Sequence, residues 1–224
     1  MAGEVSGPGP GHRLEARAEH LLIRATRDAW RSVGLTVTDG GEVPFLFTSL
    51  RIDEPVAGEP VGGAPEGLIG WTFSGLDAAV TDIDGLPTEV VEPSTPALAE
   101  HPNGAIELDH VVVLTSSLDR TCAAIEAATG APLKRVRELG AMRQGFHRIG
   151  AGGLIVEVVE RPEVTDEHAS FWGVVINVAD LDAAVELIGP DGVSAPKDAV
   201  QPGRRIATVR ASVGLATPVA LMTP

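Results

Sequence analysis

The sequence has no tyrosine and only 4% aromatic residues, so it offers no series of aromatic side chains on which bases or sugars could stack. A single cysteine, Cys122, excludes an intrachain disulfide. Because Cys122 stands in an alanine-rich stretch, we expect a buried, apolar thiol rather than a catalytic one. No apolar run approaches the roughly 20 residues that a membrane-spanning helix needs, so we expect no membrane partner.

Positive charge is also scarce, with 17 lysines and arginines against 31 acidic residues and a formal net charge of −14. Such a field repels a phosphate backbone, so nucleic acid is not an expected partner. Phosphate-binding glycine fingerprints and paired-cysteine motifs are absent. The first residues lack the basic and apolar regions of a signal peptide, which favours a cytoplasmic protein.

With 224 residues, 44% of them hydrophobic, the chain is long enough for one large or two small domains. Residues 1–12 are rich in glycine and proline and are expected to form a disordered arm. Prolines recur over residues 94–104, which we interpret as a linker. The expected organisation is therefore an N-terminal α+β region over residues 13–93 and a second domain over residues 105–224.

In the N-terminal region, the spacing of apolar residues over positions 14–30 predicts one helix over residues 13–33. A strand at residues 21–25 followed by a short helix is the alternative. The remaining segments of this region predict strands at residues 35–38, 45–52 and 68–74, and a turn that leads into a strand over residues 81–93.

The second domain predicts the same order of elements twice. A strand at 106–114 precedes a helix that Ser117 can cap and Gly130 can end, and three strands follow at 133–138, 142–149 and 153–160. The order then restarts with a strand at 171–178 and a helix between Asp180 and Gly189. Strands at 193–196, 204–210 and 218–222 complete the second copy. A repeat of roughly 55–60 residues indicates a duplicated β-α-β-β-β unit.

One histidine and one glutamate mark the outer strands of the first copy. His110 begins an apolar run at residues 108–114, and Glu157 interrupts another at residues 154–160. A lone polar residue in a strand of this kind must face solvent, find a buried partner or bind a ligand. The pair is therefore the strongest functional signal in the sequence.

These motifs resemble the glyoxalase and dihydroxybiphenyl dioxygenase, or vicinal oxygen chelate, superfamily over residues 104–224. The resemblance implies an α+β fold of repeated β-α-β-β-β units, with curled mixed sheets, outer helices and an open cup. It also implies one divalent metal ion held by His110 and Glu157, which would chelate neighbouring substrate oxygens. Residues 82–93 are similar to the ending of such units, so the N-terminal region is a candidate degenerate unit. Residues 196–208 are similar to uncharacterised glyoxalase-like bacterial proteins.

The second copy departs from the pattern of this superfamily. Gly173 matches His110, and Ala220 or Val219 matches Glu157, so neither position offers a metal ligand. Because a catalytic site usually has three protein ligands, another residue would have to complete it. The candidates for that third ligand are His147, His168, Glu107 and Glu89.

Further candidates for ligand binding are Gln144, His147, Trp172, Arg204 and Arg205. Strand alternation places Gln144 and Arg148 on one face and His147 on the other. It likewise sends Arg204 and Arg205 to opposite faces, so one arginine can clamp a carboxylate ligand or balance Glu157. Phe171 and Trp172 serve either as core residues or as a pocket wall.

Three functions fit these features. The first is a metal-dependent lyase, isomerase or dioxygenase acting on a small oxygenated molecule at His110 and Glu157. The second is a metal-free protein that binds or sequesters a small molecule in the same cup, which the loss of both ligands in the second copy favours. The third is an interaction module without a ligand. The chain is expected to be a monomer or a homodimer.

Overall fold

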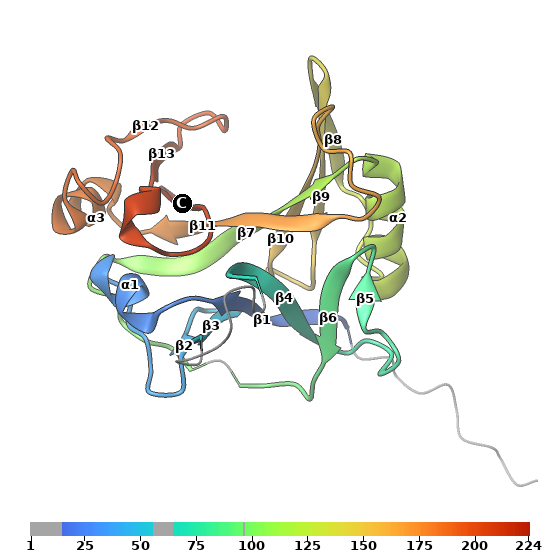
Figure 1. Ribbon diagram of the computed structural model, residues 1–224, viewed down its shortest axis with the longest axis horizontal. Coiled ribbons are helices and arrows are strands. Elements are labelled where there is room, and N and C mark those ends of the chain that lie inside the picture. The colour runs from blue at the N-terminus through green and yellow to red at the C-terminus, as the bar shows by residue number, and fades with distance from the viewer. Residues whose placement is uncertain (1–14, 56–64, 96) are drawn as a thin grey trace, which may run out of the picture.

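The computed structural model describes residues 15–55, 65–95 and 97–224. The predicted disordered arm, residues 1–12, lies outside the described residues. Two mixed β-sheets stack on each other, as Figure 1 shows, with the six-stranded sheet below the eight-stranded one.

The six-stranded sheet has the order β2-β3-β1-β4-β6-β5. Its elements are β1 (Arg17–Arg24), α1 (Arg27–Ser32), β2 (Glu42–Val43), β3 (Ser49–Asp53), β4 (Gly67–Ser74), β5 (Asp82–Ile83) and β6 (Leu86–Val90).

The eight-stranded sheet has the order β12-β13-β14-β11-β7-β10-β9-β8. Its elements are β7 (Ala105–Thr115), α2 (Leu118–Thr129), β8 (Arg135–Leu139), β9 (Met142–Arg148), β10 (Ile155–Glu160), β11 (Ser170–Val178), α3 (Leu181–Ile188), β12 (Lys197–Asp198), β13 (Arg205–Thr208), the 3₁₀ turn η1 (Ala211–Val213) and β14 (Val219–Met222).

Each sheet consists of two units in which the last strand lies parallel to the first. The parallel pairs are β1 with β3 and β4 with β6 in one sheet, and β7 with β10 and β11 with β14 in the other. The first strands of the two units in a sheet are antiparallel, β1 to β4 and β7 to β11. The N-terminal half thus repeats the arrangement of the C-terminal half, although its second unit has no helix between the described strands β4 and β5.

The predicted helix over residues 13–33 is wrong, and the alternative of a strand followed by a short helix is closer to the structure. Leu21 and Ile23 are fully buried while Leu22 and Arg24 are half-buried, which is the alternation of a strand. The apolar positions here fit the period of a helix as well as that of a strand. Pairing with β3 and β4, which are distant in sequence, makes this segment a strand.

Two smaller predictions are also wrong. Residues 35–38 form no strand; the Thr38 N–H donates to the Glu42 carbonyl across the turn at residues 39–40. At residues 193–196 only Val193 makes a β-bridge, to Val209, and β12 follows at Lys197. The helix ends are confirmed: Ser117 and Asp180 accept hydrogen bonds from the backbone N–H of Arg120 and Ala183.

The buried faces of the two sheets share one continuous hydrophobic core. Trp71 of β4 meets Phe171 of β11 edge-to-face, with ring centroids 5.1 Å apart. Trp30 of α1 and Ile125 of α2 are fully buried in the same cluster. The opposite face of each sheet is therefore turned away from this core.

The predicted domain boundary at residues 94–104 stays a prediction.

Candidate functional site

His110 and Glu157 lie on the face of the eight-stranded sheet that points away from the core. His110 pairs with Ile155 of the parallel strand β10, and Glu157 pairs with Phe146 of β9. Paired residues on neighbouring strands project from the same face, so these four side chains share one surface. The residues between them, such as Val111 and Val156, are buried on the core face.

The sheet curls around this surface into the cup that the resemblance implies. Strands β8–β9 and the β12–β13 segment both rise above the sheet, on the side away from β1 and β4 (Figure 1). The turn after β12 and strand β8 belong to opposite edges of the sheet, yet Gln201 and Arg135 line the same cleft, of about 250 Å³. Phe146 and Ile155 supply an apolar part of its lining.

Three side chains meet at the floor of the cup, one pair in contact as a potential ion pair and the other joined by a hydrogen bond. His110 Nε2 lies 3.2 Å from Glu157 Oε2, and Gln144 Nε2 donates to Glu157 Oε1 over 2.6 Å. The His110 and Glu157 side chains keep 10% and 14% of their surface accessible to solvent. The pair is thus largely desolvated but still reachable from solvent.

A β-bulge in β7 adds a fourth side chain, Asp109. His110 pairs with Val175 and Leu108 pairs with Ile176, so Asp109 is the extra residue between them. Its Oδ2 atom lies 2.6 Å from His110 Nδ1. The histidine ring is consequently held between two carboxylates, one on each nitrogen.

The other oxygen of Asp109 is held by two side chains from the second unit. Arg204 Nη2 donates to Asp109 Oδ1 over 2.9 Å, and Asn177 Nδ2 donates to the same atom over 3.0 Å. Arg204 also donates from Nε to the Thr223 carbonyl over 2.7 Å. Together these contacts hold Asp109 in one position behind the imidazole.

The two carboxyl groups have opposite electrostatic environments. Burial would raise the pKa of Asp109, but hydrogen bonds from His110 and Arg204 outweigh it and lower that pKa well below the usual range. Burial raises the pKa of Glu157, and the attraction of His110 and Arg137 does not cancel the effect. Asp109 is therefore the stable anion, while Glu157 is the group that readily takes a proton.

The 3.2 Å separation of His110 Nε2 and Glu157 Oε2 is short enough for a proton to pass between the two groups. With Nδ1–H donating to Asp109, a neutral ring leaves Nε2 as an acceptor for the protonated Glu157 carboxyl. Alternatively, the imidazolium donates from both nitrogens to two carboxylates. The proton can also be offered to an oxygen atom of a bound molecule, so the site can donate or accept a hydrogen bond.

The donor set does not fit a divalent metal ion. In residues 15–55, 65–95 and 97–224, no three His, Cys, Asp or Glu side chains come together as a metal site. Arg204 and Asn177 occupy Asp109 Oδ1 and His110 Nδ1 occupies Oδ2, so neither oxygen is free to complete the pair. Two donors, His110 and Glu157, are fewer than the three that catalytic sites usually have.

The candidate third ligands lie elsewhere. His147 donates from Nδ1 to the Ala131 carbonyl oxygen over 2.9 Å, on the opposite, buried face. Glu107 accepts from Asn177, and Glu89 lies near His20 in the other sheet. His168 is exposed and packs its Cβ beside Gly85.

The second unit cannot supply the missing ligands either. Gly173 lies opposite Val112 on the neighbouring strand, and a Cβ built on it would be 2.5 Å from the Pro218 carbonyl oxygen. A histidine there would require the backbone to move. Ala220 pairs with Val175 and has no donor atom in its side chain.

The remaining predicted ligand-binding residues have different surroundings. Gln144 contacts Glu157, and Arg204 reaches the site through Asp109. Arg205 instead makes an exposed ion pair with Asp182 at the start of α3, over 2.7 Å. Trp172 is the extra residue of a bulge in β11 and is 43% exposed, without a polar contact to His110 or Glu157.

Sequence reasoning missed Asp109 and Asn177. The available signal was the acidic residue directly before His110, but strand alternation assigns neighbouring residues to opposite faces. Only the bulge in β7, which depends on pairing with β11, places the Asp109 carboxylate beside the His110 ring.

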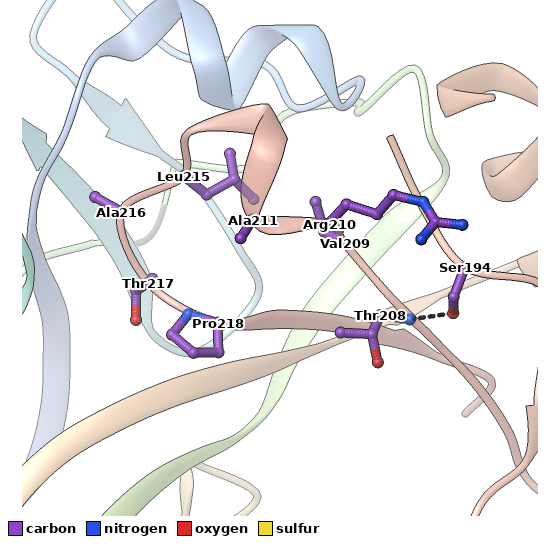
Figure 2. Close-up of a pocket in the computed structure, with 9 residues that line it drawn as sticks. All are labelled: Ser194, Thr208, Val209, Arg210, Ala211, Leu215, Ala216, Thr217 and Pro218. Atoms are coloured by element: carbon purple, nitrogen blue, oxygen red, sulfur yellow. Dashed lines mark hydrogen bonds between the residues drawn. The ribbon is translucent and has the colours of Figure 1, made fainter. Parts of the chain in front are cut away.

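A second cleft, of about 640 Å³, lies beside β13, η1 and β14 (Figure 2). Its walls include Val209, Leu215 and Pro218, and Thr208 N donates to Ser194 Oγ at one end. Arg210 is the only ionisable residue among those that line it. It therefore lacks acid–base groups of the kind that meet at His110.

Comparison with known proteins finds similarity in structure alone. No protein-family model matches the sequence, and no curated protein matches it. A mutant of 4-hydroxymandelate synthase from Streptomyces coelicolor superposes with a TM-score of 0.66 at 14% identity, over 92% of this chain and 92% of that one.

Smaller structures match only part of the chain. Methylmalonyl-CoA epimerase from Mycobacterium tuberculosis has a TM-score of 0.46 at 15% identity, over 54% of this chain and 89% of that one. A variant of the Streptomyces coelicolor epimerase with 2-nitronate-propionyl-CoA has a TM-score of 0.43 at 19% identity, over 52% and 93%.

Among the described residues, no helix is long and apolar enough to cross a membrane.

The repeated units, the curled mixed sheets and the structural match over 92% of the chain agree on one architecture. The predicted fold class and resemblance are thus confirmed: the chain has the fold of the vicinal oxygen chelate superfamily.

Proposed function

We propose that this chain binds a small oxygenated molecule in the cup of its eight-stranded sheet, by hydrogen bonds and without a metal ion. The observation that carries the proposal is the position of His110, between Asp109 and Glu157 at distances of 2.6 and 3.2 Å. The histidine to which the resemblance assigns a metal here has a carboxylate beside each ring nitrogen.

The chemistry of the floor suits a carbonyl or hydroxyl oxygen. Burial raises the pKa of Glu157, so its carboxyl takes up a proton more readily than an exposed glutamate does. Phe146 and Ile155 offer apolar contact to the rest of the molecule. A few convergent polar groups within an apolar surface are typical of small-molecule sites.

A second candidate function, proton transfer on the same ligand, is favoured by the 3.2 Å separation of His110 Nε2 and Glu157 Oε2. Asp109 would fix the imidazole, while Glu157 would exchange a proton with a carbon next to the ligand carbonyl. Hydrogen–deuterium exchange at such a carbon, followed by NMR, distinguishes catalysis from binding. Exchange that is catalysed by the wild type and lost in Glu157→Gln supports this second function.

The binding proposal is tested by a thermal-shift screen of small diketones and hydroxy ketones, with and without EDTA. At least one compound should bind, with an affinity that EDTA leaves unchanged. Glu157→Gln should weaken it by at least about tenfold, which corresponds to about 1.4 kcal/mol. The control Glu163→Gln, an exposed carboxyl outside the cup, should not.

Two results would count against the proposal. One is binding that disappears with EDTA and returns with Mn, Ni, Zn or Fe, because the site would then hold a metal. The other is a screen in which no compound binds, or in which Glu157→Gln leaves the affinity of every bound compound unchanged.

A further inference from the structure

Cations gather on one wall of the cup in spite of the strongly acidic composition of the chain. Residues 134–148 contain Lys134, Arg135, Arg137, Arg143 and Arg148, against a single acidic residue, Glu138. Of these cations, all but Arg143 line the cleft of about 250 Å³. In a chain of net charge −14, this local excess needs a physical reason.

Most other arginines of the described chain are neutralised by carboxylates. Eight of them form ion pairs: Arg17, Arg27, Arg31, Arg51, Arg120, Arg143, Arg204 and Arg205. In the same described residues, the side chains of Arg135 and Arg137 have no ion pair and no hydrogen bond. Their charge is left for solvent or for a ligand.

Strand register directs these two arginines to the floor of the site. Arg135 pairs with Phe146, which pairs with Glu157, and Arg137 pairs with Gln144, which donates to Glu157. Paired residues share a face, so both guanidinium groups arise on the side of the sheet where His110 lies. Two strand spacings separate Arg135 from Glu157, or roughly 10 Å.

The attraction between Arg137 and Glu157 supports this placement. It opposes the burial that raises the pKa of Glu157, as a guanidinium group on the same face of the sheet does. Gln201, from the turn after β12, lines the cleft opposite these arginines. The cleft therefore has a cationic wall, an apolar lining and an uncharged polar group facing them.

We propose that the ligand of the cup is an organic anion, whose carboxylate or phosphate is bound by Arg135 and Arg137. Its apolar body packs on Phe146 and Ile155, and its oxygenated end points to His110 and Glu157. Planar guanidinium groups bind such anions with two hydrogen bonds at once, and the partly enclosed site strengthens the attraction. This inference rests on the proposed function, because it names the class of molecule that the same site takes.

The test uses three probes of similar size: benzoate, phenyl phosphate and neutral benzyl alcohol. Each is titrated at low ionic strength, where charge attraction is not screened, and binding is followed by ligand-observed NMR. Benzoate or phenyl phosphate should bind, and benzyl alcohol should bind at least about tenfold more weakly. If only phenyl phosphate binds, the ligand class is phosphate esters. If both anions bind, the ligand class includes carboxylates as well.

A double variant locates the interaction. Arg135→Gln with Arg137→Gln should reduce anion affinity to that of benzyl alcohol. The matched control, Lys197→Gln with Arg210→Gln, removes two positive charges outside this cleft and should retain the affinity. Circular dichroism and urea unfolding of both variants check that they fold.

Three outcomes would overturn the inference. They are equal binding of benzyl alcohol, an equal loss in the control double variant, or no binding of either anion. The arginines would then serve to keep the exposed edge strand β8 from pairing with other chains. If neutral diketones still bind in a manner that depends on Glu157, the proposed function survives this failure.

Discussion

Replacing Asp109 by asparagine should destabilise the protein strongly, although the two side chains have nearly the same shape. Asp109 accepts three hydrogen bonds, from His110 Nδ1 at 2.6 Å, Arg204 at 2.9 Å and Asn177 at 3.0 Å. Hydrogen bonds to a charged group contribute about 1.5–3 kcal/mol each, against about 1 kcal/mol for neutral ones. Because asparagine keeps one acceptor oxygen, we expect a loss of about 3 kcal/mol in the free energy of unfolding.

Urea unfolding at pH 7 measures this loss, and a Tm lowered by about 6–12 °C should accompany it. The pH dependence gives a second check. The folded-state pKa of Asp109 is lowered, so its contribution is fully present above the unfolded-state value of about 3.9. The difference between wild type and variant should therefore narrow as the pH falls below about 4.

The matched control is Asp182→Asn, which removes an exposed carboxylate that pairs with Arg205. Exposed ion pairs contribute little, so its effect should be much smaller than that of Asp109→Asn. Equal effects of the two variants, or a difference that grows as the pH falls below 4, would refute the assignment of Asp109 as the buried anion of the site.

Three other predictions concern the site and its scaffold. Burial raises the pKa of Glu157, so wild-type stability should fall relative to Glu157→Gln as the pH rises above about 4.3; urea midpoints that move the other way would contradict this. Ser117→Ala removes the cap of α2 and should cost about 1 kcal/mol of unfolding free energy, and an unchanged urea midpoint would argue against it. Burial raises the pKa of Cys122 to about 11, so at pH 8 about one thiol in a thousand is ionised. Ellman's reagent should label this thiol slowly until urea unfolds the chain, and rapid native labelling would show that it is accessible.

Local signals predicted the helices of the second half, because a cap and a terminating glycine act within a few residues. Helix α2 is capped by Ser117 and Gly130, and helix α3 by Asp180 and Gly189. The strand β1 was missed because its apolar residues fit a helix as well as a strand. Its state depends on β3 and β4, whose positions in space the sequence does not display.

The candidate site was predictable only in part, for a related reason. His110 and Glu157 follow from the repeat, but the role of Asp109 depends on the bulge against β11. The other sheet has the same feature: Glu19 is the extra residue before His20 in β1. An acidic residue followed by histidine within the first strand of a sheet, found twice, is a signal that sequence reading could have used.

Even so, the two bulges have different contacts. Glu19 is held by Ser74 and Ser94, and His20 instead contacts Thr72. Asp109 is bound by the adjacent imidazole and by Arg204. The partners of a buried carboxylate thus depend on which strands are adjacent, and the chain order alone does not specify them.

Metal content is the measurement that tests the central claim most directly. The protein is purified without chelator, exposed separately to Mn, Ni, Zn and Fe, desalted and analysed for bound metal. We predict less than about a tenth of an equivalent, since His110 and Glu157 are fewer than the usual three ligands. Close to one equivalent in the wild type, lost in Glu157→Gln, would contradict a metal-free site.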